Sequence, residues 1–167
     1  MKKRALLTTA ALLLLTTSSP LWASYEKGLE ALKHYDYETV YKEWKSLAEQ
    51  GQAEIQSTIA VMFHTGVGVK QDYAKAFYWY KKAAEQGLPA AQANLGVMYA
   101  KGTGTKRDLV QSYAWYSVAA SALSIDKVGS ALWGIDYLAT LMTPEEIKQA
   151  KQLTQTYEKK YLKTKKK

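Results

Sequence analysis

The chain has 167 residues, of which 47% are apolar and none is cysteine, and its formal net charge is +8. This length fits one modest domain, and the apolar content excludes a disordered chain. The lack of cysteine excludes disulfide staples, a thiol nucleophile and a thiolate metal site. The excess positive charge lies at the two ends, because residues 24–158 hold all 15 acidic residues and 14 of the basic ones. This nearly neutral body has no basic stripe, so we expect no nucleic-acid partner.

Residues 1–23 have the parts of a cleavable signal peptide. Three basic residues at positions 2–4 precede an apolar run over 5–15, and Ala23 ends a segment suited to cleavage. This run of eleven residues is too short to cross a bilayer core, which needs about 20. A disulfide-free chain behind a lysine-rich signal peptide fits a bacterial periplasm. We therefore predict a secreted, periplasmic protein, with an uncleaved inner-membrane anchor as the alternative reading.

The next unit, residues 24–51, reads as a short helical hairpin. Apolar residues at three- and four-residue spacing predict a first helix from Ser24 to His34 and a second helix after Asp36. The carboxylate of Asp36 suits an N-cap, since it accepts from the free backbone N–H groups of the first turn. Gly51 suits the helix end, where positive φ is common.

A phrase then recurs with a period of 36 residues, in units spanning 52–87 and 88–123. It comprises a glycine pair, an aspartate six residues after the first glycine, a Trp-Tyr pair and an Ala-Ala pair. Such self-similarity indicates stacked helical units. We interpret the glycines as turns and the aspartates as helix caps. The residues assigned to turns and caps are Gly66, Gly68, Asp72, Gly102, Gly104 and Asp108.

Residues 124–161 break the period and read as a C-terminal capping pair of helices. The first helix is predicted over 126–141. Thr143, Pro144 and Glu146 then spell a capping box with proline at the first helical position, which starts a helix through Tyr161. We expect the lysine-rich tail, 162–167, to be disordered. Its alternative role is a weak contact with an anionic surface.

The residues show no catalytic, cofactor-binding or metal-binding set. His34 and His64 lie thirty residues apart, and Ser24 and Lys27 spell Ser-x-x-Lys without the partner motifs of penicillin-recognising enzymes. The recurrent Trp79 and Trp115 are interpreted as packing between units, with a stacking platform for sugar or peptide as the alternative for any exposed ring. We therefore expect a protein that is not an enzyme.

The repeated phrase resembles the Sel-one-like repeat (SLR), a relative of the tetratricopeptide repeat. The run from Ala91 to Tyr99 and the glycines, aspartate, Trp-Tyr and Ala-Ala pairs that follow carry the resemblance, and residues 55–87 form a second copy. Residues 36–51 resemble the opening unit of exported bacterial members of this family. The resemblance implies an all-α fold without a sheet, a right-handed α-solenoid of antiparallel helix pairs.

The family also implies a concave surface, lined by the first helix of each pair, that holds protein partners. By register, eight residues face this groove. They are Glu54, Ser57, Val61 and His64 in one copy, and Ala90, Ala93, Val97 and Lys101 in the next. This mild, mixed surface suits a peptide or helix better than a highly charged ligand. Residues that recur in both repeats are interpreted as structural. We therefore expect function at positions where the repeats differ, such as His64 in one copy and Ala100 in the next.

The leading hypothesis is a non-catalytic adaptor of the bacterial cell envelope that binds a peptide or protein segment. The alternative is the penicillin-binding or β-lactamase-like activity described for cysteine-rich relatives, which the lack of cysteine disfavours. A homodimer stays open, because two full repeats make a short groove.

Overall fold

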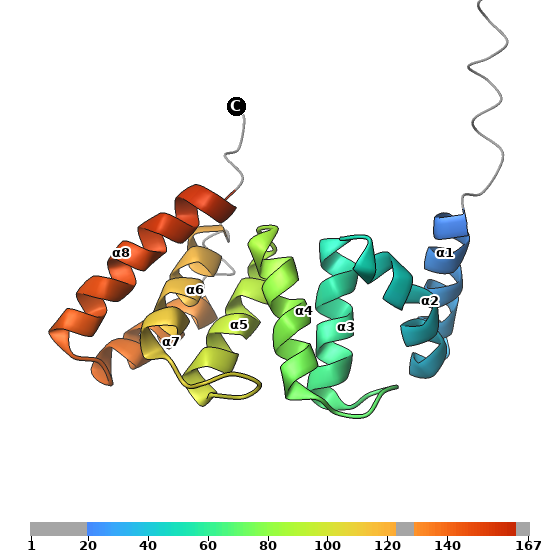
Figure 1. Cartoon of the computed structure of the whole chain (residues 1–167), viewed down its shortest axis with the longest axis horizontal. Helices are drawn as coiled ribbons and strands as arrows, with labels where there is room; N and C mark the ends of the chain where they lie inside the picture. Colours follow the sequence, from blue (N-terminus) through green and yellow to red (C-terminus); the bar gives the residue numbers. More distant parts are fainter. Residues whose placement is uncertain (1–19, 123–128, 163–167) are drawn as a thin grey trace, which may run out of the picture.

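The computed structural model describes residues 20–122 and 129–162, with the side chains of 129–133 left out. In these ranges the chain forms helices and no strand. The helices follow one another along the long axis of the molecule, from α1 at one end to α8 at the other (Figure 1). Their bounds are α1 Pro20–Lys33, α2 Tyr37–Glu49, α3 Ala53–Thr65, α4 Tyr73–Glu85, α5 Pro89–Lys101, α6 Leu109–Ala122, α7 Gly129–Thr140 and α8 Pro144–Tyr161. The predicted all-α fold is confirmed, and the chain is an α-solenoid.

Consecutive helices pack as hairpins, α1 with α2, α3 with α4 and α5 with α6. Each hairpin then packs on the next, through α2 with α3 and α4 with α5. A continuous row of apolar side chains fills the space between them, because each helix repeats its apolar residues at three- and four-residue spacing. Its most deeply buried members include Val40, Leu47, Ile59, Ala76, Tyr80, Leu95 and Met98.

Aspartates begin the second helix of three hairpins. The carboxylates of Asp36, Asp72 and Asp108 accept from the backbone N–H three residues on, at 3.1, 3.0 and 2.9 Å. Each therefore satisfies a donor that the helix itself leaves without a partner. These bonds recur in register, so they belong to the scaffold.

The two glycines of each repeat turn have different duties. The first, Gly66 or Gly102, takes positive φ and ends a helix. The second, Gly68 or Gly104, also has positive φ, and a Cβ there would strike the preceding repeat. At Gly104 this Cβ would meet the carbonyl of Tyr73, the first residue of α4. The backbone of the second glycine therefore packs closely against the preceding repeat.

Small residues in the first helix let an aromatic ring of the second helix approach. A Cβ at Gly96 would lie 2.8 Å from the ring of Tyr116, and a Cβ at Gly28 would enter the ring of Trp44. Trp44 in turn donates its indole N–H to the carbonyl of Tyr25, at 3.2 Å. In the α1–α2 and α5–α6 hairpins, an aromatic ring of the second helix therefore packs against glycine backbone of the first helix.

Both α7 and α8 pack on α6. Trp115 of α6 is 2% exposed, and its ring lies 4.5 Å from that of Tyr157 and 5.3 Å from that of Tyr161. The predicted capping box starts α8, with Thr143 N–H donating to Glu146 at 2.8 Å. The far end of α8 reaches the turn between α4 and α5, where a Cβ at Gly87 would lie 2.6 Å from the Tyr161 carbonyl.

Helix α1 begins at Pro20, four residues before the predicted start at Ser24. The added turn is held by ring contacts, since Trp22 lies 5.7 Å from Tyr25. The predicted start of the helix at 126, most of the predicted signal peptide and the lysines of 163–167 lie outside the described residues. Among the helices that are described, none has the length and apolar character to cross a membrane.

Candidate functional site

The predicted groove residues form one row on α3 and one on α5. In each row the spacing of three and four residues places the side chains on one helix face. On α3, Glu54 and Val61 are exposed, whereas Ser57 and His64 are half-buried. On α5, Ala90 and Lys101 are exposed, and Ala93 and Val97 are half-buried.

Each row passes a hollow in the surface. Val61 lines the first, of about 330 Å³, together with residues of α1 and α2, and we call it the α1–α3 hollow. Val97 and Lys101 line the second, of about 340 Å³, which we call the α5–α7 hollow. The two hollows lie on opposite sides of their rows, because the first opens toward the preceding hairpin and the second toward the helix that follows.

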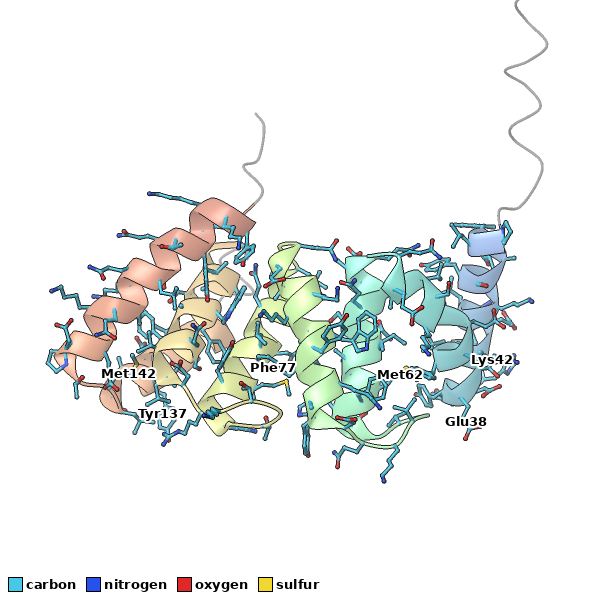
Figure 2. All side chains as sticks on the ribbon, viewed as in Figure 1. Glu38, Lys42, Met62, Phe77, Tyr137 and Met142 are labelled. Atoms are coloured by element: carbon cyan, nitrogen blue, oxygen red, sulfur yellow. The ribbon has the colours of Figure 1, made fainter. Side chains whose placement is uncertain are left out.

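The α5–α7 hollow lies where the end of α5, the turn into α6 and the face of α7 meet. Tyr116 reaches it from α6, Leu138 lines it from α7, and Leu141 lines it from just beyond the end of α7. Tyr137 is 54% exposed at its rim. Figure 2 shows Tyr137 along the same lower edge of the view as the turn between α5 and α6. The lining is mostly apolar and holds two cations, Lys101 and Arg107.

The equivalent place in the first repeat is occupied by rings. His64 packs edge-on against Tyr73 and Tyr80, with ring centroids 5.4 and 6.3 Å apart. One period later the same positions hold Ala100, Leu109 and Tyr116. The second repeat therefore loses one ring and has an aliphatic side chain in place of another, and the hollow occupies that space.

Burial of the two equivalent tyrosines differs accordingly. Tyr80 is 2% exposed, and burial raises its pKa to about 12. Tyr116 is half-buried, and burial raises its pKa as well. Both phenols are therefore neutral at pH 7. Tyr116 differs in presenting part of its ring to the α5–α7 hollow.

Arg107 combines a structural hydrogen bond with a positive charge. Its Nε donates to the carbonyl of Ala100 at 3.1 Å, near the end of α5. In the first repeat the side-chain amide of Gln71 donates to the carbonyl of His64 at 2.8 Å in the same manner. The bond is thus common to both repeats, and the charge belongs to the second alone. Arg107 was not among the predicted groove residues, although its difference from Gln71 one period earlier could have identified it.

The two histidines have different surroundings. His34 lies 3.2 Å from Glu30 at the surface, and His64 is packed among tyrosine rings. No hydrogen bond joins Ser24 to Lys27 in this part of the chain. In the same ranges, no three His, Asp or Glu side chains gather as ligands for a metal ion.

The recurrent tryptophans differ in their surroundings. Trp115 is enclosed by α8, whereas Trp79 is partly buried and packs against the core. The exposed ring beside Trp79 is that of Tyr78, at 51% exposure and 5.0 Å from the indole. Packing is therefore the main role of both tryptophans.

Comparison with known proteins finds the same repeat. Residues 59–88 and 89–122 match the family model of the Sel1 repeat. A protective antigen of uropathogenic Escherichia coli, which displays an SLR fold, matches with 28% identity and a TM-score of 0.73. This match covers 84% of the chain and 30% of the antigen, so the chain spans less than a third of that protein. A Sel1 repeat protein from Oxalobacter formigenes matches with 28% identity and a TM-score of 0.61, over 70% of this chain and 87% of that one. No curated protein matches the sequence.

Proposed function

Because the chain carries two Sel1 repeats and folds as a solenoid of such units, we propose that it is a non-catalytic adaptor of the bacterial cell envelope. Sel1 repeats commonly mediate protein–protein interaction, and proteins with this fold are typically scaffolds without catalytic activity. The finer proposal is that a peptide or protein segment binds along the rows of α3 and α5. The observation that carries it is the exposure of a mild, mixed surface along these helices, beside a hollow.

The surface of α5 has the properties of a contact area. Ala90 and Ala93 are small, so a partner backbone comes close to the helix, and Val97 offers apolar area at the mouth of the α5–α7 hollow. A segment laid in such a groove gains affinity from a few apolar anchors. Glu54 at one end of the α3 row and Lys101 at one end of the α5 row provide charges of opposite sign.

Photocrosslinking in cells tests this proposal. A photoreactive residue replaces Val97, and in a matched control it replaces Tyr78, which is also exposed but lies on α4. We expect adducts with one or a few proteins from position 97 and none of these from position 78, with mass spectrometry to identify them. Equal adducts from both positions, or none from position 97, would contradict the proposal.

The place of action is part of the proposal. We propose export directed by residues 1–23 and cleavage after Ala23. The mature chain would then lose Trp22, while Tyr25 would keep its stacking on Trp44, where the ring centroids lie 5.9 Å apart. N-terminal sequencing of protein from the periplasmic fraction should begin at Ser24. A chain that keeps residues 1–23 in the membrane fraction would favour the anchor instead.

A further inference from the structure

The difference between the two repeats points to the chemistry of the partner at the α5–α7 hollow. This inference rests on the proposed function, because it assigns a ligand class to one end of the α5 row. Four positions set the hollow apart from its counterpart. The first repeat has His64, Thr65, Gln71 and Tyr73 where the second has Ala100, Lys101, Arg107 and Leu109. The changes remove rings and add two positive charges.

The space suits large apolar side chains. Val97 and Leu109 line it from one repeat, and Leu138 and Leu141 line it from the other side. A volume of about 340 Å³ lies in the range of ligand-binding pockets. Leu141 is 46% exposed, so apolar area remains in contact with water until a ligand covers it.

The charges suit a carboxylate. Neither Lys101 nor Arg107 forms an ion pair with a residue that the structure describes. The Nε bond to Ala100 fixes the guanidinium and leaves its two Nη groups as donors. A guanidinium held in this way matches the two oxygens of a carboxylate.

Two carboxylates near Arg107 already have partners. Asp108 and Glu146 line a shallow hollow on its other side. Asp108 accepts from the backbone of Gln111, and Glu146 accepts from the N–H and hydroxyl of Thr143. Their negative charges partly offset the positive charge of Arg107, but their hydrogen bonds hold them at the starts of α6 and α8. Among the residues that the structure describes, the lining of the α5–α7 hollow includes no acidic side chain.

We propose that the α5–α7 hollow binds an acidic, apolar peptide segment. A large apolar side chain of the segment enters the space beside Tyr116, and a neighbouring Asp or Glu side chain pairs with Lys101 and Arg107. The small residues of the α5 row lead directly to this hollow, so a polypeptide lying along α5 brings both groups to it. That continuity favours a peptide over a free fatty acid, which would use the hollow alone.

Fluorescence anisotropy with the full chain tests this assignment. The probe is a labelled peptide with both ends blocked and Leu-Phe-Asp-Glu at its centre. One control peptide carries Leu-Phe-Asn-Gln and another Ser-Ser-Asp-Glu. We expect each control to bind about tenfold more weakly or worse, since each lacks one of the two interactions. Equal binding of the neutral and acidic peptides would overturn the proposal.

The first repeat supplies the test variants. Lys101→Thr with Arg107→Gln installs its residues, and glutamine keeps the bond to the helix carbonyl as Gln71 does. This variant should lose about tenfold in affinity for the acidic peptide and little for the neutral one. Lys42→Thr with Lys70→Gln removes the same charge elsewhere and should change neither. Equal losses in both double variants would overturn the proposal.

A second set of variants fills the α5–α7 hollow. Ala100→His with Leu109→Tyr restores the rings of the first repeat and should abolish binding, with an unchanged circular dichroism spectrum as the check on folding. Binding that persists in this folded variant would overturn the proposal.

Rival ligands are tested in parallel. If laurate, a peptide with a free C-terminal carboxylate or a second copy of the chain binds and the blocked acidic peptide does not, the assignment is wrong. If position 97 gives specific crosslinks but the acidic peptide does not bind, only the proposed ligand class is overturned. Failure of both would reject the adaptor as well.

Discussion

The two repeats have the same frame and different surfaces. In both, an aspartate caps the second helix and paired glycines form the turn. In both, a side chain in the turn also donates to the backbone carbonyl of the residue seven positions earlier, near the end of the first helix. They differ where His64 and Tyr73 are replaced by Ala100 and Leu109. The first set packs ring on ring, and the second lines a hollow. Residues that recur thus maintain the stacking, and residues that differ shape the surface.

The second repeat also packs against the C-terminal helices. Its second helix, α6, contacts α5, α7 and α8, whereas α4 has its main contacts with α3 and α5. The same sequence phrase therefore has unequal energetic roles in the two repeats, and this inequality can be measured.

The largest expected effect separates the two tryptophans. Trp115→Ala removes a ring enclosed by Tyr157 and Tyr161 and should lower the free energy of unfolding by about 3–5 kcal/mol. Trp79→Ala removes a partly buried ring and should cost less than half as much. Urea unfolding followed by circular dichroism measures both. Equal losses would contradict the unequal contribution of the two tryptophans to stability.

The second effect separates the two glycines of one turn. Gly104→Ala adds left-handed strain and a collision with the Tyr73 carbonyl, so it should cost about 3 kcal/mol. Gly102→Ala has similar φ but meets Arg107 at 3.1 Å or more, and should cost about 1–2 kcal/mol. Thermal melts of the two variants provide the comparison. A Gly102 variant as unstable as the Gly104 variant would argue against contact between repeats at the second glycine.

A smaller effect concerns a bond present only in the second repeat. The Ser112 hydroxyl donates to the carbonyl of Gly96 at 2.8 Å, and the first repeat has Ala76 at this position. Ser112→Ala should therefore cost about 1 kcal/mol. Ser117→Ala on the same helix is the control and should stay within about 0.5 kcal/mol. A neutral Ser112 variant would mean that the hydroxyl bond adds no stability.

The smallest effect is a dependence on pH. A backbone bond from Lys75 lowers the pKa of Asp72, and one from Thr143 lowers the pKa of Glu146. Because these pKa values are lower in the folded chain, their contribution is complete above the ordinary values of 3.8 and 4.5. It is lost as the pH falls through the lowered values.

Asp72→Ser keeps a neutral cap and should reduce the loss of stability in that acidic range. Glu43→Gln, in the middle of α2, serves as the control for removal of a negative charge. Melting temperatures between pH 2 and pH 6 give the comparison. An acid profile unchanged by Asp72→Ser would exclude this carboxylate as a source of the dependence.

Much of the fold could be predicted from the sequence because its signals are local. The caps at Asp36 and Thr143 depend on a few neighbouring residues, and the helix bounds agree with them. The arrangement of α7 and α8 is not local. It depends on Trp115 meeting the rings of Tyr157 and Tyr161, some forty residues later in the chain.

The site was only partly predictable for a similar reason. Val97 and Lys101 were named from the repeat register, and the contrast between His64 and Ala100 was visible in the sequence. The walls supplied by Leu138 and Leu141 lie beyond the repeats, so no periodic pattern pointed to them. The hollow lies between helices, so its prediction would require the packing of α7 on α6 to be known.

Amide hydrogen exchange, with and without the acidic apolar peptide, tests the contrast between the repeats most directly. Bound peptide should slow exchange over residues 97–109 and 134–141, which form the α5–α7 hollow. Residues 61–73, the equivalent segment of the first repeat, should exchange at the same rate in both samples. Equal protection of the two repeats, or protection of 61–73 alone, would contradict the view that the second repeat holds the binding surface and the first serves as scaffold.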